Sequence, residues 1–165
     1  MKKIKSEELL TIAVEIESIG QRFYNKMSGV VKEEHLKVFF SDIAKIELVH
    51  CEKFKKMREK IIAEKSLVTA RPILGKDGDQ YIDVKEIKDR LFNRYDLVKK
   101  FSKLNDFDSV LNVLMELEES AIDYYQKISP MISPSEVSNI TNIINEEKMH
   151  YKELTDLRNK LRSVI

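Results

Sequence analysis

Two segments of this sequence each carry a glutamate and a histidine three residues apart. The pairs are Glu47 with His50 and Glu147 with His150, and they use two of the three histidines in the chain. Residues at positions i and i+3 lie on one face of a helix, so each pair can present an oxygen and a nitrogen to the same ion. Carboxylate and imidazole ligands without a thiolate suit iron or manganese, and zinc less specifically.

The two pairs occupy matching places in an internal repeat. The segment Phe39–Phe54 aligns with Asn139–Leu154 at an offset of 100 residues, and this alignment places glutamate over glutamate and histidine over histidine. Chance explains one Glu-x-x-His motif in a charge-rich helix far more easily than two at matching places in a repeat.

A second alignment extends the repeat toward the N-terminus of each copy. Ile16–Tyr24 aligns with Leu117–Tyr125 at an offset of 101 residues. The residues paired in this way are Glu17 with Glu118 and Tyr24 with Tyr125. We interpret the chain as two copies of one helical hairpin.

Helical projection places these acidic residues and histidines among apolar side chains. At about 100° per residue, Glu47 and His50 fall near the centre of an apolar stripe, and their counterparts in the second copy do the same. Four unpaired carboxylates in a core would be strongly destabilising, and no Lys or Arg lies on these stripes. Two divalent cations would balance the charge of four carboxylates. The alternative is a set of core polar groups that satisfy one another. The predicted metal ligands are Glu17, Glu47, His50, Glu118, Glu147 and His150.

Four long helices must position these residues. We expect them over Ser6 to Gly29, Lys32 or Glu33 to the low 60s, Asp106 or Asp108 to Ser129-Pro130, and Ser133 to near the C-terminus. Ser6 is a candidate N-cap, and "SPSE" at 133–136 has the pattern of a capping box with proline at the first helical position.

The predicted fold is all-α, a four-helix bundle forming a single domain over residues 1–165. One helix pair spans 6–65 and the other 107–163. They are joined by a long crossover, 66–106, which contains a short helix at 84–101.

Composition excludes several other classes of protein. Four glycines and three prolines in 165 residues leave few turns for a sandwich or barrel. The net charge is +1 with no basic block, which argues against nucleic-acid binding. Cys51 is the only cysteine, so no internal disulfide is expected, and we read it as a small core residue. No signal peptide or apolar run long enough to cross a membrane is evident, and we expect a cytoplasmic setting.

Four segments carry a resemblance to a known family: "AVEIESIGQRFY", "IAKIELVHCEKF", "LMELEESAIDYYQKI" and "IINEEKMHYKEL". They resemble the ferritin-like di-iron proteins of the rubrerythrin group. The resemblance implies that the six predicted ligands hold two iron ions. It also implies that Tyr24 and Tyr125 hydrogen-bond ligand carboxylates, although both also suit plain core positions. Glu146 matches an acidic residue that orients a ligand histidine.

The sequence departs from that group at three places. Rubrerythrins carry a further glutamate where this chain has Ala121, so the ligand set is closer to a bacterioferritin-type ferroxidase centre. Ile46 stands where the first copy would carry the counterpart of Glu146, so we expect the two metal sites to be unequal. No rubredoxin-like segment is evident, so electrons would come from another protein.

The resulting functional expectation is a di-iron oxidoreductase that reduces hydrogen peroxide or dioxygen with electrons from a partner such as a rubredoxin. Manganese or zinc are alternative metals. We also expect a homodimer. Two rival functions remain: a ferroxidase or iron-binding protein, and a helical module that a metal only stabilises.

Overall fold

The computed structural model describes residues 5–64, 73–75, 78–80 and 107–163. Its long helices are α1 (Ser6–Val30), α2 (Glu34–Ala63), α4 (Phe107–Ile128) and α5 (Val137–Arg162). Two single 3₁₀ turns, Ser129–Met131 and Pro134–Glu136, connect α4 to α5. The prediction of an all-α four-helix bundle is confirmed.

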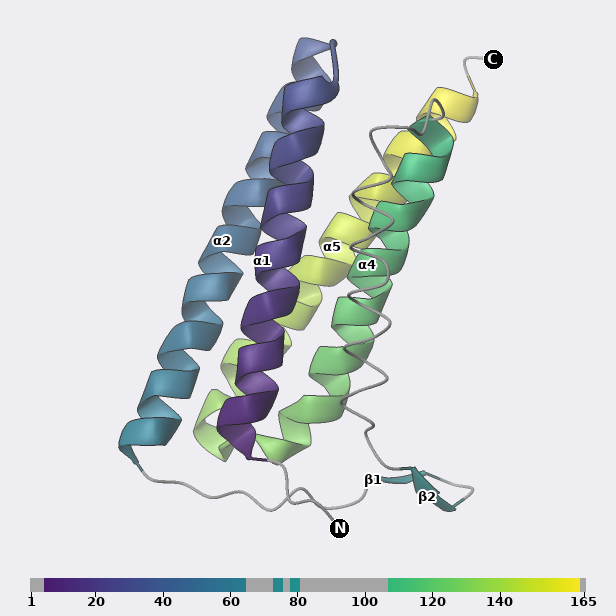
Figure 1. Cartoon of the computed structure of the whole chain (residues 1–165). Helices are drawn as coiled ribbons and strands as arrows, with labels where there is room; N and C mark the ends of the chain where they lie inside the picture. Colours follow the sequence, from purple (N-terminus) through teal and green to yellow (C-terminus); the bar gives the residue numbers. More distant parts are fainter. Residues whose placement is uncertain (1–4, 65–72, 76–77, 81–106, 164–165) are drawn as a thin grey trace.

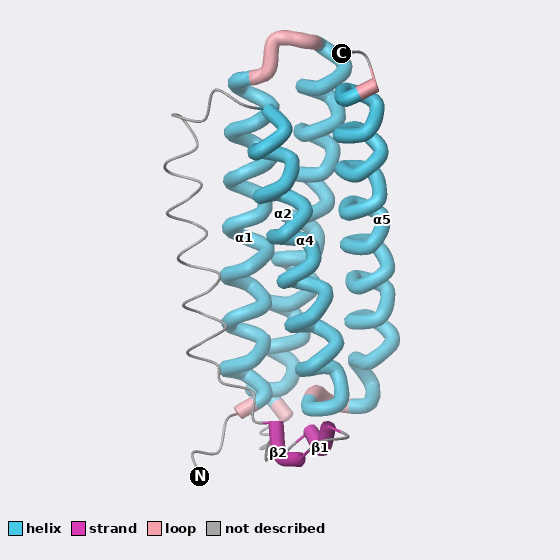
Figure 2. Tube along the Cα trace, turned by 90° about the vertical axis from the view of Figure 1, so that its right-hand side faces the viewer, coloured by secondary structure: helices cyan, strands magenta, loops and turns pink. Residues whose placement is uncertain are grey.

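The helices form two antiparallel hairpins, α1 with α2 and α4 with α5 (Figure 1). α1 and α5 run in one direction and α2 and α4 in the other, which is the wiring that a long crossover between α2 and α4 requires. The strands β1 (Ile73–Gly75) and β2 (Gly78–Gln80) pair as a small antiparallel hairpin beyond one end of the bundle (Figure 2). The predicted short helix at 84–101 lies outside the described residues.

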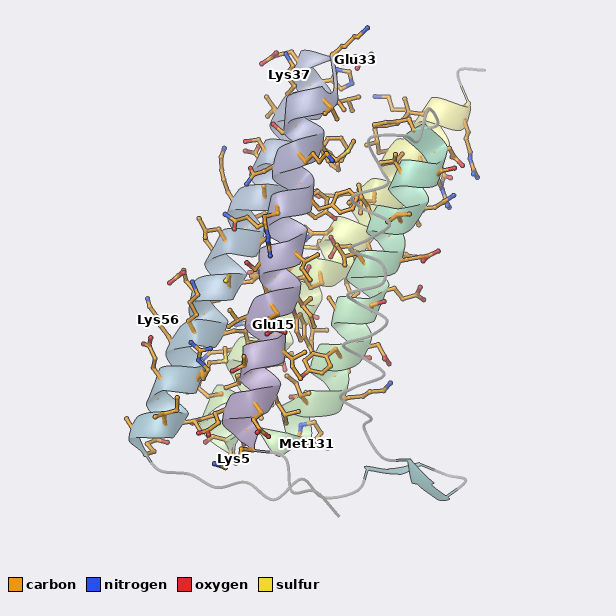
Figure 3. The ribbon with its side chains drawn as sticks, viewed as in Figure 1. Lys5, Glu15, Glu33, Lys37, Lys56 and Met131 are labelled. Atoms are coloured by element: carbon orange, nitrogen blue, oxygen red, sulfur yellow. The ribbon has the colours of Figure 1, made fainter. Side chains whose placement is uncertain are left out.

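Two of the predicted helix starts differ in detail from the structure. Ser6 is the first residue of α1 and not its N-cap; its hydroxyl is buried and donates to the carbonyl oxygen of Met131 at 3.1 Å. Figure 3 shows Lys5 and Met131 at the same end of the bundle.

The predicted capping box at Ser133 does not form. The Ser133 hydroxyl lies 3.1 Å from that of Ser135, and Glu136 instead accepts hydrogen bonds from Lys60 and Asn139. The chain makes a 3₁₀ turn at Pro134–Glu136, as is frequent at helix termini, and α5 begins at Val137.

The apolar core is divided into two blocks along the bundle axis. One contains Leu9, Ile16, Phe54, Tyr125 and Ile140 among others, and the second contains Phe23, Phe40, Leu111 and Leu154 among others. On α2 and α5 the predicted metal ligands fall in the sequence between these two blocks, and on α1 and α4 they lie at the edge of the first block, next to the second. A belt of buried polar groups therefore crosses the middle of an otherwise apolar interior. None of the described helices has the length and apolarity needed to cross a bilayer.

Candidate metal centre

The six predicted ligands lie together in this belt, and every one is at most 4% exposed. α1 supplies Glu17 and α4 supplies Glu118, while α2 and α5 each supply one Glu-x-x-His pair. Helical periodicity brings each pair to the bundle axis, because the flanking residues on the same faces are apolar and buried.

The candidate ligand atoms form two groups. The first group comprises Glu17, Glu47, His50 and Glu147, and the second comprises Glu47, Glu118, Glu147 and His150. In each group, one atom per residue lies within 4.8 Å of the others. Ligand atoms held at about 2.2 Å from one ion can be up to about 4.4 Å apart, so each group needs only a small contraction to enclose a cation. Glu47 and Glu147 belong to both groups, as bridging carboxylates between two ions would.

Several atoms of the first group lack a hydrogen-bond partner among the described residues. They are Glu17 Oε2, Glu47 Oε1, His50 Nδ1 and Glu147 Oε1, and all are inaccessible to solvent. His50 Nδ1 lies 2.7 Å from Glu147 Oε1 and 3.4 Å from Glu17 Oε2, yet it makes a hydrogen bond to neither. Buried acceptors that crowd together without bonding one another are costly unless a cation lies between them. The residues present therefore fit a metal ion.

The second group is arranged around His150. Its Nδ1 lies 3.1 Å from Glu47 Oε1, 3.1 Å from Glu147 Oε2 and 3.9 Å from Glu118 Oε2. The two imidazole rings are 6.1 Å apart between centroids. Each histidine thus directs its Nδ1 toward carboxylates of its own group.

Two buried tyrosines link the hairpins reciprocally. Tyr24 of α1 donates a hydrogen bond to Glu118 of α4, and Tyr125 of α4 donates one to Glu17 of α1. Burial and the neighbouring carboxylates raise the pKa of both phenols, so these side chains remain hydrogen-bond donors. Tyr124 is a third buried tyrosine, but its hydroxyl donates to the carbonyl oxygen of Leu9.

The outer faces of the two histidines differ. His50 Nε2 contacts the carboxylate of Glu146, which also lies 3.6 Å from Lys53 Nζ. Position 46, which corresponds to Glu146 in the other copy, holds an exposed isoleucine. The structure therefore brings a carboxylate to the outer face of His50, while His150 has only Ile46 at the corresponding position.

A pocket between α2 and α5 extends to His150. Its volume is about 360 Å³, and exposed apolar side chains, Ile46, Val49 and Met149, form much of its wall. Polar residues complete the lining: Lys45, Lys53, Glu146 and Glu153. Sequence reasoning did not find this pocket, since only the packing angle of two helices from different halves of the chain creates it.

Burial shapes the protonation of the cluster when no metal is bound. Burial and the charge of Glu147 raise the pKa values of Glu47 and Glu118, and burial with Glu147 also raises that of Glu17. Burial would raise the pKa of Glu147 as well, but the adjacent imidazoles of His150 and His50 hold it below the ordinary value. Burial would lower the pKa of His50, yet Glu147 and Glu17 outweigh it and raise this pKa to about 10. Without a cation, the cluster is therefore compensated by protons.

Gly20 is a residue of this site that sequence reasoning missed. A Cβ atom at this position would lie 2.7 Å from Glu47 Oε2. The available signal was a small residue one turn after Glu17, at the place that aligns with Ala121. His35 is exposed and Cys51 is buried with its Sγ 3.8 Å from the carbonyl oxygen of Val14, so neither takes part in the cluster.

Comparisons with known proteins agree with this geometry. The rubrerythrin family matches residues 8–158. The fold is similar to the crystal structure of a protein from Thermotoga maritima that is assigned to the ferritin-like diiron-carboxylate proteins. The TM-score is 0.70 and the identity 22%, over 96% of this chain and 97% of that chain. This confirms the ferritin-like form of the bundle. A search of curated protein sequences gave no significant match. The family and the buried Glu/His cluster together indicate a di-iron type of site. This chain belongs to the rubrerythrin family.

Proposed function

We propose that this chain is a non-haem di-iron oxidoreductase that reduces hydrogen peroxide or dioxygen with electrons from a partner protein. The observation that carries the proposal is the pair of buried ligand groups that share Glu47 and Glu147. Four carboxylates balance the charge of two divalent cations, and each histidine adds one nitrogen. We assign Glu17 and His50 to one ion, Glu118 and His150 to the other, and the two shared glutamates to both.

Two ferrous ions held by these six residues would supply the two electrons that, with two protons, reduce hydrogen peroxide to two water molecules. The protein's contribution is to hold the ligands. The phenols of Tyr24 and Tyr125 fix the orientation of Glu118 and Glu17, and the apolar blocks above and below keep water away. Manganese suits the same ligands, whereas zinc would bind without redox chemistry.

The pocket beside His150 supports a small neutral substrate. Its wall of Ile46, Val49 and Met149 favours an uncharged molecule such as hydrogen peroxide or dioxygen, and its two lysines and two glutamates leave no excess charge of either sign. Filling the pocket by Ile46→Trp is expected to slow oxidation of the reduced protein by peroxide at least tenfold. Leu48→Trp is the matched control, because Leu48 is similarly exposed on α2 but does not line the pocket. Equal rates in the two variants would reject this entry route.

The electron donor in this proposal is a separate redox protein such as a rubredoxin, acting in a reducing cytoplasm. We also propose that the protein is a homodimer, and analytical ultracentrifugation can measure this oligomeric state. The electron donor and the dimer are predictions that rest on the resemblance and on the two-copy organisation of the chain, and the reducing setting rests on the free, buried Cys51.

One observation favours a second candidate, a ferroxidase. Ala121 is buried in α4 where rubrerythrins place a further glutamate, so an iron lacks that extra carboxylate during its change of charge. Stopped-flow oxidation separates the candidates. Fast reaction with peroxide followed by reduction with rubredoxin supports the oxidoreductase, and oxygen consumption with release of iron supports the ferroxidase. If the protein unfolds when a chelator removes the metal and shows neither reaction, the metal only stabilises the bundle.

The metal centre itself is tested by removing one shared and one unshared ligand. The double variant Glu47→Ala/His150→Ala is expected to lose di-iron binding, as measured by metal analysis of protein purified without oxygen. Retention of two irons per chain in this variant would refute the site.

A further inference from the structure

Gly20 is a glycine in the middle of a long helix, where glycine is normally unfavourable. It lies in α1, three residues after Glu17, and is buried. Its φ is not in the left-handed region, so the helix does not need the conformational freedom of glycine there. Alanine would favour the helix more strongly. The reason for a glycine must therefore be space.

The atoms nearest to the open space beside Gly20 belong to one side chain, Glu47. A Cβ built on Gly20 would lie 2.7 Å from Oε2, 3.3 Å from Cδ and 3.6 Å from Cγ of Glu47, and these are its three nearest neighbours. A distance of 2.7 Å is too short for a carbon–oxygen contact without a bond. A methyl group at position 20 would consequently push the Glu47 carboxylate out of its place.

Glu47 is the residue for which such a displacement has the largest consequence. It belongs to both candidate ligand groups, and its Oε1 lies 3.1 Å from His150 Nδ1. The aligned residue of the second copy is Ala121, which carries the methyl group that Gly20 lacks. The first copy thus departs from the second at the point where Glu47 approaches α1.

We propose that Gly20 is a positioning residue, whose missing side chain lets the Glu47 carboxylate reach both metal positions. This inference rests on the proposed di-metal site. It assigns to α1 a further contribution to the site besides Glu17 and Tyr24, which is the space that the Glu47 carboxylate occupies.

The test is Gly20→Ala, compared with Gly29→Ala as a matched control. Gly29 lies in the last turn of the same helix, and a Cβ there would meet nothing within 4 Å. Two quantities are measured for each variant: Co²⁺ affinity, by optical titration of the metal-free protein, and the Tm of the metal-free protein. In Gly20→Ala we expect the affinity to fall about 10- to 100-fold, as when a supporting contact of a ligand is lost. The metal-free Tm should stay level or rise by a few degrees, because alanine favours the helix and the carboxylate is a flexible chain end.

The control should show the same level or raised Tm with unchanged affinity. Wild-type affinity in Gly20→Ala would overturn the proposal. A metal-free Tm lowered by several degrees would also overturn it, because the methyl group would then disturb the packing of the helices and not the carboxylate alone. Failure of the wild-type protein to bind two Co²⁺ ions would instead reject the proposed di-metal function.

Discussion

The two hairpins of this bundle are copies of one unit, yet they do not contribute equally to the site. Both provide a glutamate, a Glu-x-x-His pair and a tyrosine at matching places. They differ around these residues. Glu146 of the second copy contacts His50, whereas the first copy has Ile46 at the equivalent position. The first copy has Gly20 where the second has Ala121. The residues common to both copies form the proposed two-ion centre, and the residues that differ give each half its own environment.

The reciprocal tyrosines show why neither hairpin forms the site alone. Each phenol crosses from one copy to a glutamate of the other, and both candidate ligand groups draw residues from both hairpins. Contacts at the ends of the bundle add to this, as Lys60 of α2 bonds Glu136 at the start of the α5 segment at 2.6 Å. Assembly of the site therefore requires the two hairpins to dock.

The largest expected effect comes from comparing a shared ligand with one that serves a single group. Glu147→Ala should bind neither ion tightly, whereas His50→Ala should keep one ion, at the position of Glu118 and His150. Native mass spectrometry of the Mn²⁺-loaded variants counts the ions. One tightly held ion in Glu147→Ala would show that this glutamate does not serve both positions.

Protonation of the metal-free cluster gives the next largest effect. The folded-state pKa of His50, about 10, exceeds its unfolded value of 6.5, so its stabilising contribution is complete below pH 6.5 and is lost as the pH rises toward 10. The raised pKa values of Glu17, Glu47 and Glu118 act in the same direction, since ionising these groups destabilises the fold. The lowered pKa of Glu147 contributes no slope in this window.

We therefore expect the metal-free protein to lose on the order of 3 kcal/mol of unfolding free energy between pH 6.5 and 10. Metal binding holds the ligands deprotonated, so stabilisation by Mn²⁺ should grow over the same range. Urea unfolding at several pH values, with and without Mn²⁺, measures both. Parallel pH profiles for the two forms would contradict the account.

The unequal support of the two histidines can be altered in either direction. Glu146→Ala should weaken the ion held by His50 about 10-fold or more, and Ile46→Glu should strengthen the ion held by His150 by a similar factor. Stepwise Co²⁺ titration reports the two dissociation constants. Leu48→Glu, which adds the same charge elsewhere on α2, is the control. If it raises the affinity for this ion as much as Ile46→Glu does, the added negative charge alone explains the gain, without a contact to His150.

The smallest effect compares the two tyrosines. Tyr24→Phe and Tyr125→Phe each remove a buried hydrogen bond to a carboxylate, so each should cost about 1–3 kcal/mol of unfolding free energy, and the two costs should be similar. Tyr124→Phe, which removes a bond to a backbone carbonyl, provides the comparison. A loss of unfolding free energy in only one of Tyr24→Phe and Tyr125→Phe would show that the two hydrogen bonds are not equivalent.

The apolar periodicity of the sequence was sufficient to predict the four long helices and to predict that the six candidate ligands lie together. Glu47 and His50 lie on a strongly apolar face, so burial of that face forces them inward. The prediction of a capping box at Ser133 was wrong, because Glu136 bonds the side chains of Lys60 and Asn139 instead. The role of Gly20 and the pocket at Ile46 could not be predicted, because both depend on how closely particular helices approach one another. The function of the tyrosines was open between core packing and hydrogen bonding, since partners about 100 residues away are set by tertiary docking alone.

The central claim is that two cations lie among four glutamates in the middle of the bundle. The most direct test is a crystal structure of protein loaded with Fe²⁺ under anaerobic conditions, with anomalous scattering measured at the iron absorption edge. We predict two peaks, one among Glu17, Glu47, His50 and Glu147 and the other among Glu47, Glu118, Glu147 and His150. An anomalous map with no peak at these positions, in a protein whose glutamates keep the same buried arrangement, would contradict the account.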